Sequence, residues 1–260
     1  MGNIIEFKNV TLNYGQKAIF SNVSFNINRG DFVTIMGANG SGKSCLAGML
    51  YGLSLYSGTI KYNNKVISEK NSDNVRENIS IIFENSSSFF MSDNVINELT
   101  SIAEKSDDID NIVKKIGISK ILHSKFEHLS CGEKQLVLLA CALVSNPKVL
   151  VLDGALNMLD NCNKNKIVKL LKQYNKKGLT IINITQNCEE MLYGGRVILL
   201  DKGRIVLDEP TKNAIEYQKE FSQLRLGLPF MADLCVKLKY YNVISKMVLD
   251  KIKLVKMIWK

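Results

Sequence analysis

Hydrophobic and polar positions divide the chain into short strands and helices that alternate along most of its length. Nearly continuous apolar runs bounded by polar or glycine residues predict buried strands, whereas apolar residues spaced three and four apart predict amphipathic helices. The buried strands expected on this basis cover residues 31–36, 79–83, 149–153 and 179–185. Because strands and helices alternate, we expect a doubly wound α/β core.

The segments around this core follow other patterns. Period-two alternation predicts antiparallel strands at 4–10 and 18–27, and hairpins at 58–67 and 196–208. Helical spacing predicts short helices, inserted between two core strands, at 92–102, 107–117 and 118–126. Further helices are expected at 134–145, 163–174, 213–224, 229–241 and 243–260.

The last of these predicted helices, 243–260, is basic and amphipathic. Its apolar residues, including Trp259, stand opposite five lysines. Such a helix can bind a membrane surface, or it can pack on the domain or on a partner subunit. Both interpretations stay open, and we favour packing.

Composition and charge narrow the class of protein. At 260 residues and 46% hydrophobic content, the chain can form one large α/β domain with an appendage. The absence of an apolar run of about 20 residues and of signal-peptide features predicts a cytoplasmic protein, or one docked to the cytoplasmic face of a membrane. Six cysteines without CxxC spacing predict reduced thiols. The net charge of +9 comes from scattered lysines, so we expect no nucleic acid partner, while a partner surface or anionic lipid headgroups are both allowed.

Residues 37–44 (GANGSGKS) fit the pattern GxxxxGK[ST] between a predicted strand and a predicted helix. A loop whose amides close around phosphate oxygens needs glycine wherever a Cβ would hold the backbone away. Lys43 can reach the β- and γ-phosphates, and the Ser44 hydroxyl can bind Mg²⁺. We therefore expect a nucleoside triphosphate site at Gly37, Asn39, Gly40, Ser41, Gly42, Lys43, Ser44 and Cys45.

Two residues outside this loop are candidates for the same site. The strand at 149–153 ends in Asp153, a carboxylate at the C-terminal end of a buried parallel strand. Tyr14, which precedes the loop, could stack its ring on an adenine base, or it could pack on the core at the end of its strand. The residues give these two alternatives for Tyr14 equal weight.

The segment 129–135 (LSCGEKQ) resembles the LSGGQ signature of ABC-type ATPases, in the LSGGEKQ form familiar among energy-coupling factor (ECF) transporters. Its distance to Asp153 matches that family, and the likeness covers about residues 4–210. Residues 226–234 (LGLPFMADL) resemble the C-terminal extension by which ECF ATPase subunits pair. The resemblance implies a P-loop NTPase fold with an N-terminal antiparallel β subdomain. It also implies an ABC domain at 1–212, with a helical subdomain at about 85–147, and a helical extension at 213–260.

This resemblance implies a head-to-tail pair of subunits, in which each ATP lies between one subunit's phosphate loop and the other's signature. It implies Mg²⁺ held by Ser44, Asp153 and Glu84, directly or through water. The partner's site would be completed by the signature residues Ser130, Cys131, Gly132 and Glu133. The expected role is the peripheral ATP-binding subunit of an ECF-type importer of a vitamin or metal ion. Its expected partners, at the cytoplasmic face of the cell membrane, are a second ABC ATPase subunit, a transmembrane coupling subunit and a substrate-binding membrane subunit.

Three positions depart from the family pattern. Gly154 stands where the family has a glutamate that polarises the attacking water, Gln186 where it has a histidine, and Glu84 where it has a glutamine. Losing a general base costs about 10²- to 10⁴-fold in rate. We therefore assign no catalytic residue and expect the chain's own site to bind MgATP but to hydrolyse it slowly, within an asymmetric heterodimer. Glu84 could substitute, as a Mg²⁺ ligand or as a displaced base.

Two other functions stay open. One is a scaffold in which ATP binding orders a complex without turnover. The other is a soluble ABC protein that acts on nucleic acid or ribosomes, against which the single ABC domain and the ECF-like tail count. Residues 89–91 (FFM) either form part of a groove for a membrane subunit's helix or lie in the core.

Overall fold

A six-stranded, mostly parallel sheet forms the centre of the molecule, in the order β10-β9-β3-β8-β7-β6. The computed structural model describes residues 2–52, 55–84, 90–103 and 106–259. The strands are β3 (Phe32–Gly37), β6 (Ile79–Phe83), β7 (Val149–Asp153), β8 (Thr180–Thr185), β9 (Arg196–Asp201) and β10 (Arg204–Pro210). All neighbouring strands pair in parallel except β9 and β10, which form the predicted hairpin. The predicted doubly wound core is confirmed.

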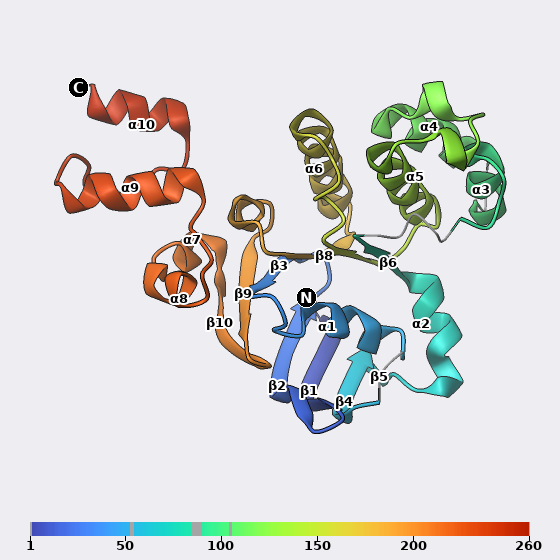
Figure 1. Ribbon diagram of the computed structural model, residues 1–260, viewed down its shortest axis with the longest axis horizontal. Coiled ribbons are helices and arrows are strands. Elements are labelled where there is room, and N and C mark those ends of the chain that lie inside the picture. The colour runs from blue at the N-terminus through green and yellow to red at the C-terminus, as the bar shows by residue number, and fades with distance from the viewer. Residues whose placement is uncertain (1, 53–54, 85–89, 104–105, 260) are drawn as a thin grey trace.

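A smaller antiparallel sheet, in the order β2-β1-β4-β5, lies on one side of this core (Figure 1). It consists of β1 (Asn3–Tyr14), β2 (Lys17–Asn28), β4 (Ser57–Tyr62) and β5 (Lys65–Val66). Helix α1 (Lys43–Leu50) packs between the two sheets, because its residues Leu46, Met49 and Leu50 share one hydrophobic cluster with strands of both. The predicted N-terminal antiparallel subdomain is therefore present.

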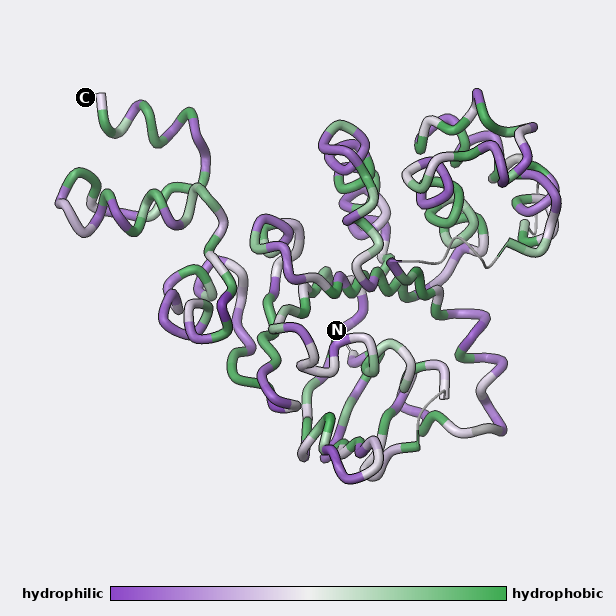
Figure 2. Tube along the Cα trace, in the orientation of Figure 1, coloured by the Kyte–Doolittle hydropathy of each residue, from purple (hydrophilic) through white to green (hydrophobic). Residues whose placement is uncertain are grey.

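The central strands are buried on both faces, which explains their continuous apolar sequences. Along β7, Val149 and Val151 enter the cluster shared with the small sheet. Leu150 and Leu152, which alternate with them, enter the cluster shared with the helices on the opposite face. Figure 2 shows these strands as a hydrophobic band across the molecule. Successive side chains of β7 therefore point alternately into the two hydrophobic clusters, one on each face of the sheet.

Helices α3 (Val95–Ile102), α4 (Ser106–Ile116), α5 (Cys131–Val144) and α6 (Asn161–Lys176) cover that opposite face (Figure 1). Of these, α3 to α5 form the expected helical insertion. Helix α2 (Ser72–Asn78), which precedes β6, was not expected. In the part of the chain that the structure describes, no helix is both long enough and apolar enough to cross a bilayer.

The prediction of a helix at 118–126 is wrong. The chain forms two 3₁₀ turns instead, Ser119–Ile121 and Phe126–His128. The carbonyl oxygens of Leu122 and Ser124 accept hydrogen bonds from the amides of Ile96 and Val95, at 2.9 and 3.2 Å. These carbonyls satisfy free amides at the start of α3, so they are not available for an α-helix of their own.

The prediction of a single helix at 213–224 is also wrong. The segment divides into two helices, α7 (Thr211–Ala214) and α8 (Gln218–Gln223). The backbone leaves helical geometry at Tyr217, with φ −89° and ψ 47°. This break allows Ile215 and Phe221 to enter the same cluster against β9. Helix α9 (Phe230–Tyr240) follows and lies close to its predicted position.

The predicted helix at 243–260 is correct only for α10 (Lys251–Ile258). Residues 241–250 instead turn back along α9, starting with Asn242 in the left-handed region at φ 58°. The Cys235 thiol of α9 donates a hydrogen bond to the Val248 carbonyl at 3.1 Å. Helix α10 begins only at Asp250, whose side chain accepts the Lys253 amide proton at 2.9 Å.

We predict that Phe221→Ala lowers the free energy of unfolding by about 3–5 kcal/mol, because Phe221 is fully buried between the extension and the sheet. Phe230→Ala is the matched control. Its ring is 67% exposed, so its loss should cost less than about 0.5 kcal/mol. Urea denaturation followed by circular dichroism measures both. Equally small effects would contradict the structure, because they would show that the extension is not part of the core.

Candidate functional site

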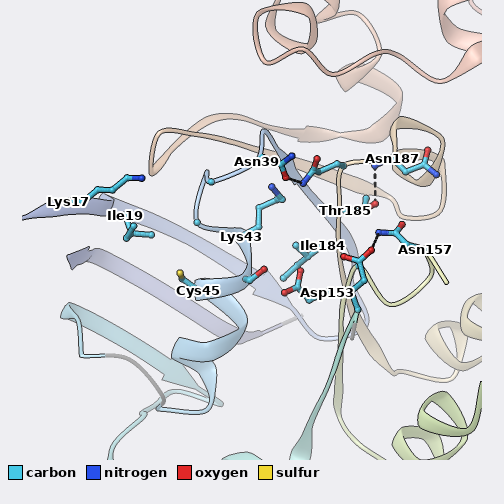
Figure 3. A pocket seen from close by; sticks show the side chains of 16 residues that line it. Lys17, Ile19, Asn39, Lys43, Cys45, Asp153, Asn157, Ile184, Thr185 and Asn187 are labelled. Carbon is cyan, nitrogen blue, oxygen red and sulfur yellow. Dashed lines mark hydrogen bonds between the residues drawn. The ribbon is translucent and has the colours of Figure 1, made fainter. Parts of the chain in front are cut away.

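A pocket of about 760 Å³ opens where the parallel strands end. It gathers residues at or just after the ends of β3, β6, β7 and β8. Figure 3 shows those from β3, β7 and β8, among them Lys43, Asp153 and Thr185. Of the residues predicted from the sequence, it is lined by Asn39, Gly40, Gly42, Lys43, Ser44, Cys45, Glu84, Asp153, Gly154 and Gln186. The structure therefore brings together the phosphate loop, the strand carboxylate and the three positions that we expect to depart from the family pattern.

The side chain of Lys43 folds back onto the phosphate loop and bonds to its backbone. Lys43 is only 8% exposed, and its Nζ donates hydrogen bonds to the carbonyl oxygens of Gly37 and Ala38, both at 2.8 Å. Burial lowers the pKa of Lys43, and the charge of Asp153 partly offsets this. The loop carbonyls thus position a buried cation beside the loop amides that would bind a phosphate.

Gly42 joins this loop to α1 and serves as the N-cap of the helix, with φ +95°. A Cβ at this position would lie 3.0 Å from the Ile19 side chain and 3.1 Å from the Phe20 ring. Both the backbone conformation and the space therefore require glycine. The result is a helix N-terminus that opens into the pocket, where its partial positive charge favours an anion.

Asp153 and Ser44 form the oxygen donors that a hard divalent cation prefers. Burial raises the pKa of Asp153 and the nearby Glu84 carboxylate adds to this, while a hydrogen bond with the Ser44 hydroxyl and the charge of Lys43 lower it. A cation would relieve the repulsion between the two carboxylates. The donor set thus fits Mg²⁺ beside a triphosphate.

Glu84 lies directly over Gly154. Strands β6 and β7 pair with Phe83 opposite Asp153, so the residues that follow come side by side. A Cβ at Gly154, whose φ is +65°, would lie 3.0 Å from Glu84 Oε2. Asn157 Nδ2 donates a hydrogen bond to Glu84 Oε1 at 2.9 Å. The Glu84 carboxylate therefore occupies the space that a side chain at position 154 would need.

Gln186 contacts the phosphate loop from the end of β8. Its Nε2 donates a hydrogen bond to Asn39 Oδ1. The next residue, Asn187, donates its amide proton to Thr185 Oγ1 at 3.1 Å, which fixes the turn after the strand (Figure 3). An amide side chain at 186 can therefore bridge to the loop.

The signature residues do not line this pocket. Ser130 is the N-cap of α5, and it forms a capping box with Glu133. Its amide donates a hydrogen bond to Glu133 Oε2 at 2.9 Å, and its hydroxyl does so at 2.7 Å. These bonds lower the pKa of Glu133. Ser130 and Cys131 are exposed at this helix N-terminus, and a Cβ on Gly132 would lie 3.2 Å from the Met158 carbonyl oxygen.

Sequence reasoning missed several residues that line the pocket, namely Lys17, Ile19, Asn157, Ile184, Thr185 and Asn187. A polar residue soon after the Asp153 strand could have identified Asn157, whereas no local signal points to Lys17. Among the residues described, the pocket lining does not include Gly37, Ser41 or Tyr14. Tyr14 is 84% exposed, so the alternative that it packs on the core is wrong, and adenine stacking stays a prediction.

The segment 89–91 is described only in part, because Phe89 lies outside the described residues. Phe90 stacks on Phe126 with ring centroids 3.7 Å apart, and it packs on the cluster of the helical subdomain. Met91 is 97% exposed. Phe90 therefore packs in the core, whereas a groove for a membrane subunit's helix at this segment stays a prediction.

Comparison with known proteins identifies the family of this chain. The family profile described as ABC transporter matches residues 20–157. The energy-coupling factor transporter ATP-binding protein EcfA1 of Mycoplasma pneumoniae is 30% identical over 240 residues, which cover 89% of this chain and 88% of that protein.

Two solved structures are also similar. CbiO1 from Clostridium perfringens, described as part of the ABC transporter complex CbiONQ, has a TM-score of 0.75 and 30% identity. The likeness covers 90% of this chain and 99% of CbiO1. A dimeric ATP-binding cassette bound to ADP and phosphate has a TM-score of 0.72 and 25% identity, over 80% of this chain and 98% of that one. The chain therefore belongs to the ABC transporter family, as an ABC-type ATPase related to the ATP-binding subunits of ECF transporters.

Proposed function

We propose that this chain is the ATP-binding subunit of an ECF-type importer of a vitamin or metal ion. It would be held at the cytoplasmic face of the membrane by a transmembrane coupling subunit and a substrate-binding subunit. Its similarity to EcfA1 and to CbiO1, each named as a transporter component, supports this assignment. The observation that carries it is the exposed signature at the start of α5, outside the chain's own pocket.

An exposed signature and an open pocket on one chain are complementary halves of a site. The free amides at the start of α5 can donate hydrogen bonds to a phosphate, and the Ser130 hydroxyl can do so by turning away from Glu133, to which it donates here. Because they lie outside the chain's own pocket, they serve the nucleotide of a second ATPase subunit placed head to tail. The similar cassette of known structure is itself dimeric. Residues 226–234, in the extension at 213–260 that follows the ABC domain at 1–212, would help the two subunits pair.

Within the proposed pair, the chain's own site binds MgATP and hydrolyses it slowly. Lys43 and the loop amides would hold the phosphates, while Ser44, Asp153 and Glu84 would hold Mg²⁺, directly or through water. When bound, Mg²⁺ would neutralise negative charge on the phosphate oxygens. Gly154 has no group to orient water, and Glu84 above it is already bound by Asn157. We therefore propose that the partner ATPase differs from this chain and that its site, completed by Ser130, carries most of the turnover.

We predict that Lys43→Ala weakens ATP binding by the purified chain about ten- to a hundredfold. The loss of a buried cation that bonds phosphate costs about 1.5–3 kcal/mol. Lys172→Ala, an exposed lysine on α6, is the control and should leave the affinity unchanged. Titration with a fluorescent ATP analogue in the presence of Mg²⁺ measures both. Equal affinities for all three proteins would refute the nucleotide site.

A tagged copy of the chain purified from membranes tests the assembly. We predict that it carries with it a second ABC ATPase and at least one membrane protein, which peptide mass spectrometry would identify. The partner ATPase should have a glutamate after its strand aspartate and a histidine at the position that corresponds to Gln186. Recovery of the chain without any membrane protein would contradict the importer assignment.

In that complex, Ser130→Ala should lower the ATPase rate by about a hundredfold, because it removes a hydroxyl that would turn from Glu133 to donate to the transferred phosphate. Asn94→Ala is the matched control. Asn94 caps α3 by accepting the Asn97 amide proton at 3.0 Å, so its loss should cost a similar amount of stability, about 1 kcal/mol, and leave turnover intact. Rapid hydrolysis by the chain without a partner, abolished by Lys43→Ala, would refute the asymmetry.

A further inference from the structure

Helix α10 has two apolar faces, and only one of them is covered. Leu254 is 3% exposed and belongs to a small cluster with Cys235 of α9 and Ile244, against which Met257 also packs. The expected packing of this helix on the rest of the chain is therefore confirmed for the face that carries Leu254. The other face carries Ile252, Val255 and Trp259, which we call the α10 stripe.

The α10 stripe is continuous and open. Its residues follow one another at helical spacings of three and four, so they share one side of the helix. Ile252 is 69% exposed, Val255 48% and Trp259 84%. None of the three belongs to a hydrophobic cluster of the described residues. Figure 1 places α10 far from the helical subdomain, on the outer side of the extension.

Unpaired lysines lie on α10 and just before it. Lys251 and Lys256 border the stripe, about 70° from its centre around the helix axis, whereas Lys253 lies about 130° away. These three lysines and Lys246, which precedes the helix, are all exposed. Within the described part of 230–259, the one ion pair joins Lys237 to Asp233. Asp250 does not neutralise these lysines through an ion pair, because its carboxylate caps the helix. Figure 2 shows polar and apolar positions alternating along α10.

The end of α9 adds two aromatic side chains to the same part of the molecule. Tyr240 is 80% exposed and Tyr241 73%, and their rings meet edge to face with centroids 5.3 Å apart. The turn after α9 and the C-terminal end of α10 both lie at the outer end of the extension (Figure 1). Trp, Tyr and Lys together are typical of surfaces at the boundary between lipid and water.

These observations select one occupant for the stripe. A second copy of the chain would bring two sets of lysines together, which charge repulsion opposes. A specific protein interface buries about 1,200–2,000 Å² in total, whereas a helix of this length is only about 12 Å long. An anionic bilayer needs no matching groove, attracts the lysines and accepts the apolar side chains at headgroup depth.

We propose that the α10 stripe and its lysines bind the surface of an anionic lipid bilayer, with α10 lying parallel to it. The proposal does not rest on the nucleotide site or on the identity of the partner subunits. The pairing contact proposed above involves residues 226–234, which precede the stripe in sequence.

Trp259 is the one tryptophan in the sequence, so its fluorescence reports on this helix alone. The full chain is mixed with vesicles of phosphatidylcholine, or of equal parts phosphatidylcholine and phosphatidylglycerol. We expect a shift of the emission to shorter wavelength, together with co-sedimentation, only with the anionic vesicles. Added NaCl should weaken both, because exposed charges are screened.

The triple variant Lys251→Gln, Lys253→Gln, Lys256→Gln should lower the affinity for anionic vesicles by about a hundredfold, at about fivefold for each lysine. The matched control changes three exposed lysines of α6 in the same way, Lys169, Lys172 and Lys176, and should bind as the wild type does. Trp259→Ala leaves the charge of the helix unchanged and should also weaken co-sedimentation, because it removes an apolar side chain from the stripe. All variants should bind ATP normally, which shows that they are folded.

The proposal is overturned if the anionic vesicles produce neither the shift nor co-sedimentation, or if the control triple variant loses as much binding as the α10 variant. Equal binding to neutral vesicles would also overturn it. A shift that depends on protein concentration without vesicles would identify a second copy as the occupant. Protection of Trp259 only in the assembled transporter would identify a protein partner. Either of these last outcomes would overturn the lipid assignment.

Discussion

The whole nucleotide site depends on the parallel register of β3, β8, β7 and β6. Because these strands run in the same direction, their carboxyl ends meet at one edge of the sheet. Met36 pairs with Thr185, and Phe83 with Asp153, so the residues that follow each strand lie side by side. The register itself is held by burial on both faces, since a slip of one residue would exchange the two hydrophobic clusters.

The same edge of the sheet is connected to the C-terminal extension. The 3₁₀ turn Cys188–Leu192 begins two residues after Gln186, which contacts the phosphate loop. Glu189 in this turn accepts the Phe230 amide proton at 2.6 Å, at the start of α9. The extension is therefore anchored to the segment that follows the pocket residues Gln186 and Asn187. This arrangement joins nucleotide binding and the proposed subunit pairing in one continuous stretch of structure.

The core and the phosphate loop could be predicted from the sequence because both depend on local signals. Strands buried on both faces show as apolar runs, and the loop requires glycine at fixed spacings. Other features depend on distant contacts. The carbonyls of Leu122 and Ser124 are used by α3, and the breaks at Tyr217 and Asn242 follow from packing against other elements. The Lys17 side chain enters the pocket only because the small sheet folds beside the loop. No pattern within those segments carries this information.

Gly154 and Glu84 also have an evolutionary consequence under the proposed division of labour. A glutamate introduced at position 154 alone would place an L residue at φ +65°, with its Cβ 3.0 Å from a carboxylate oxygen of Glu84. It would suffer backbone strain and charge repulsion at once. A water-activating carboxylate there would therefore require the Glu84 side chain to move, in addition to the strained backbone. Under the proposed division of labour, a lineage with this pair of residues gains from keeping its partner subunit.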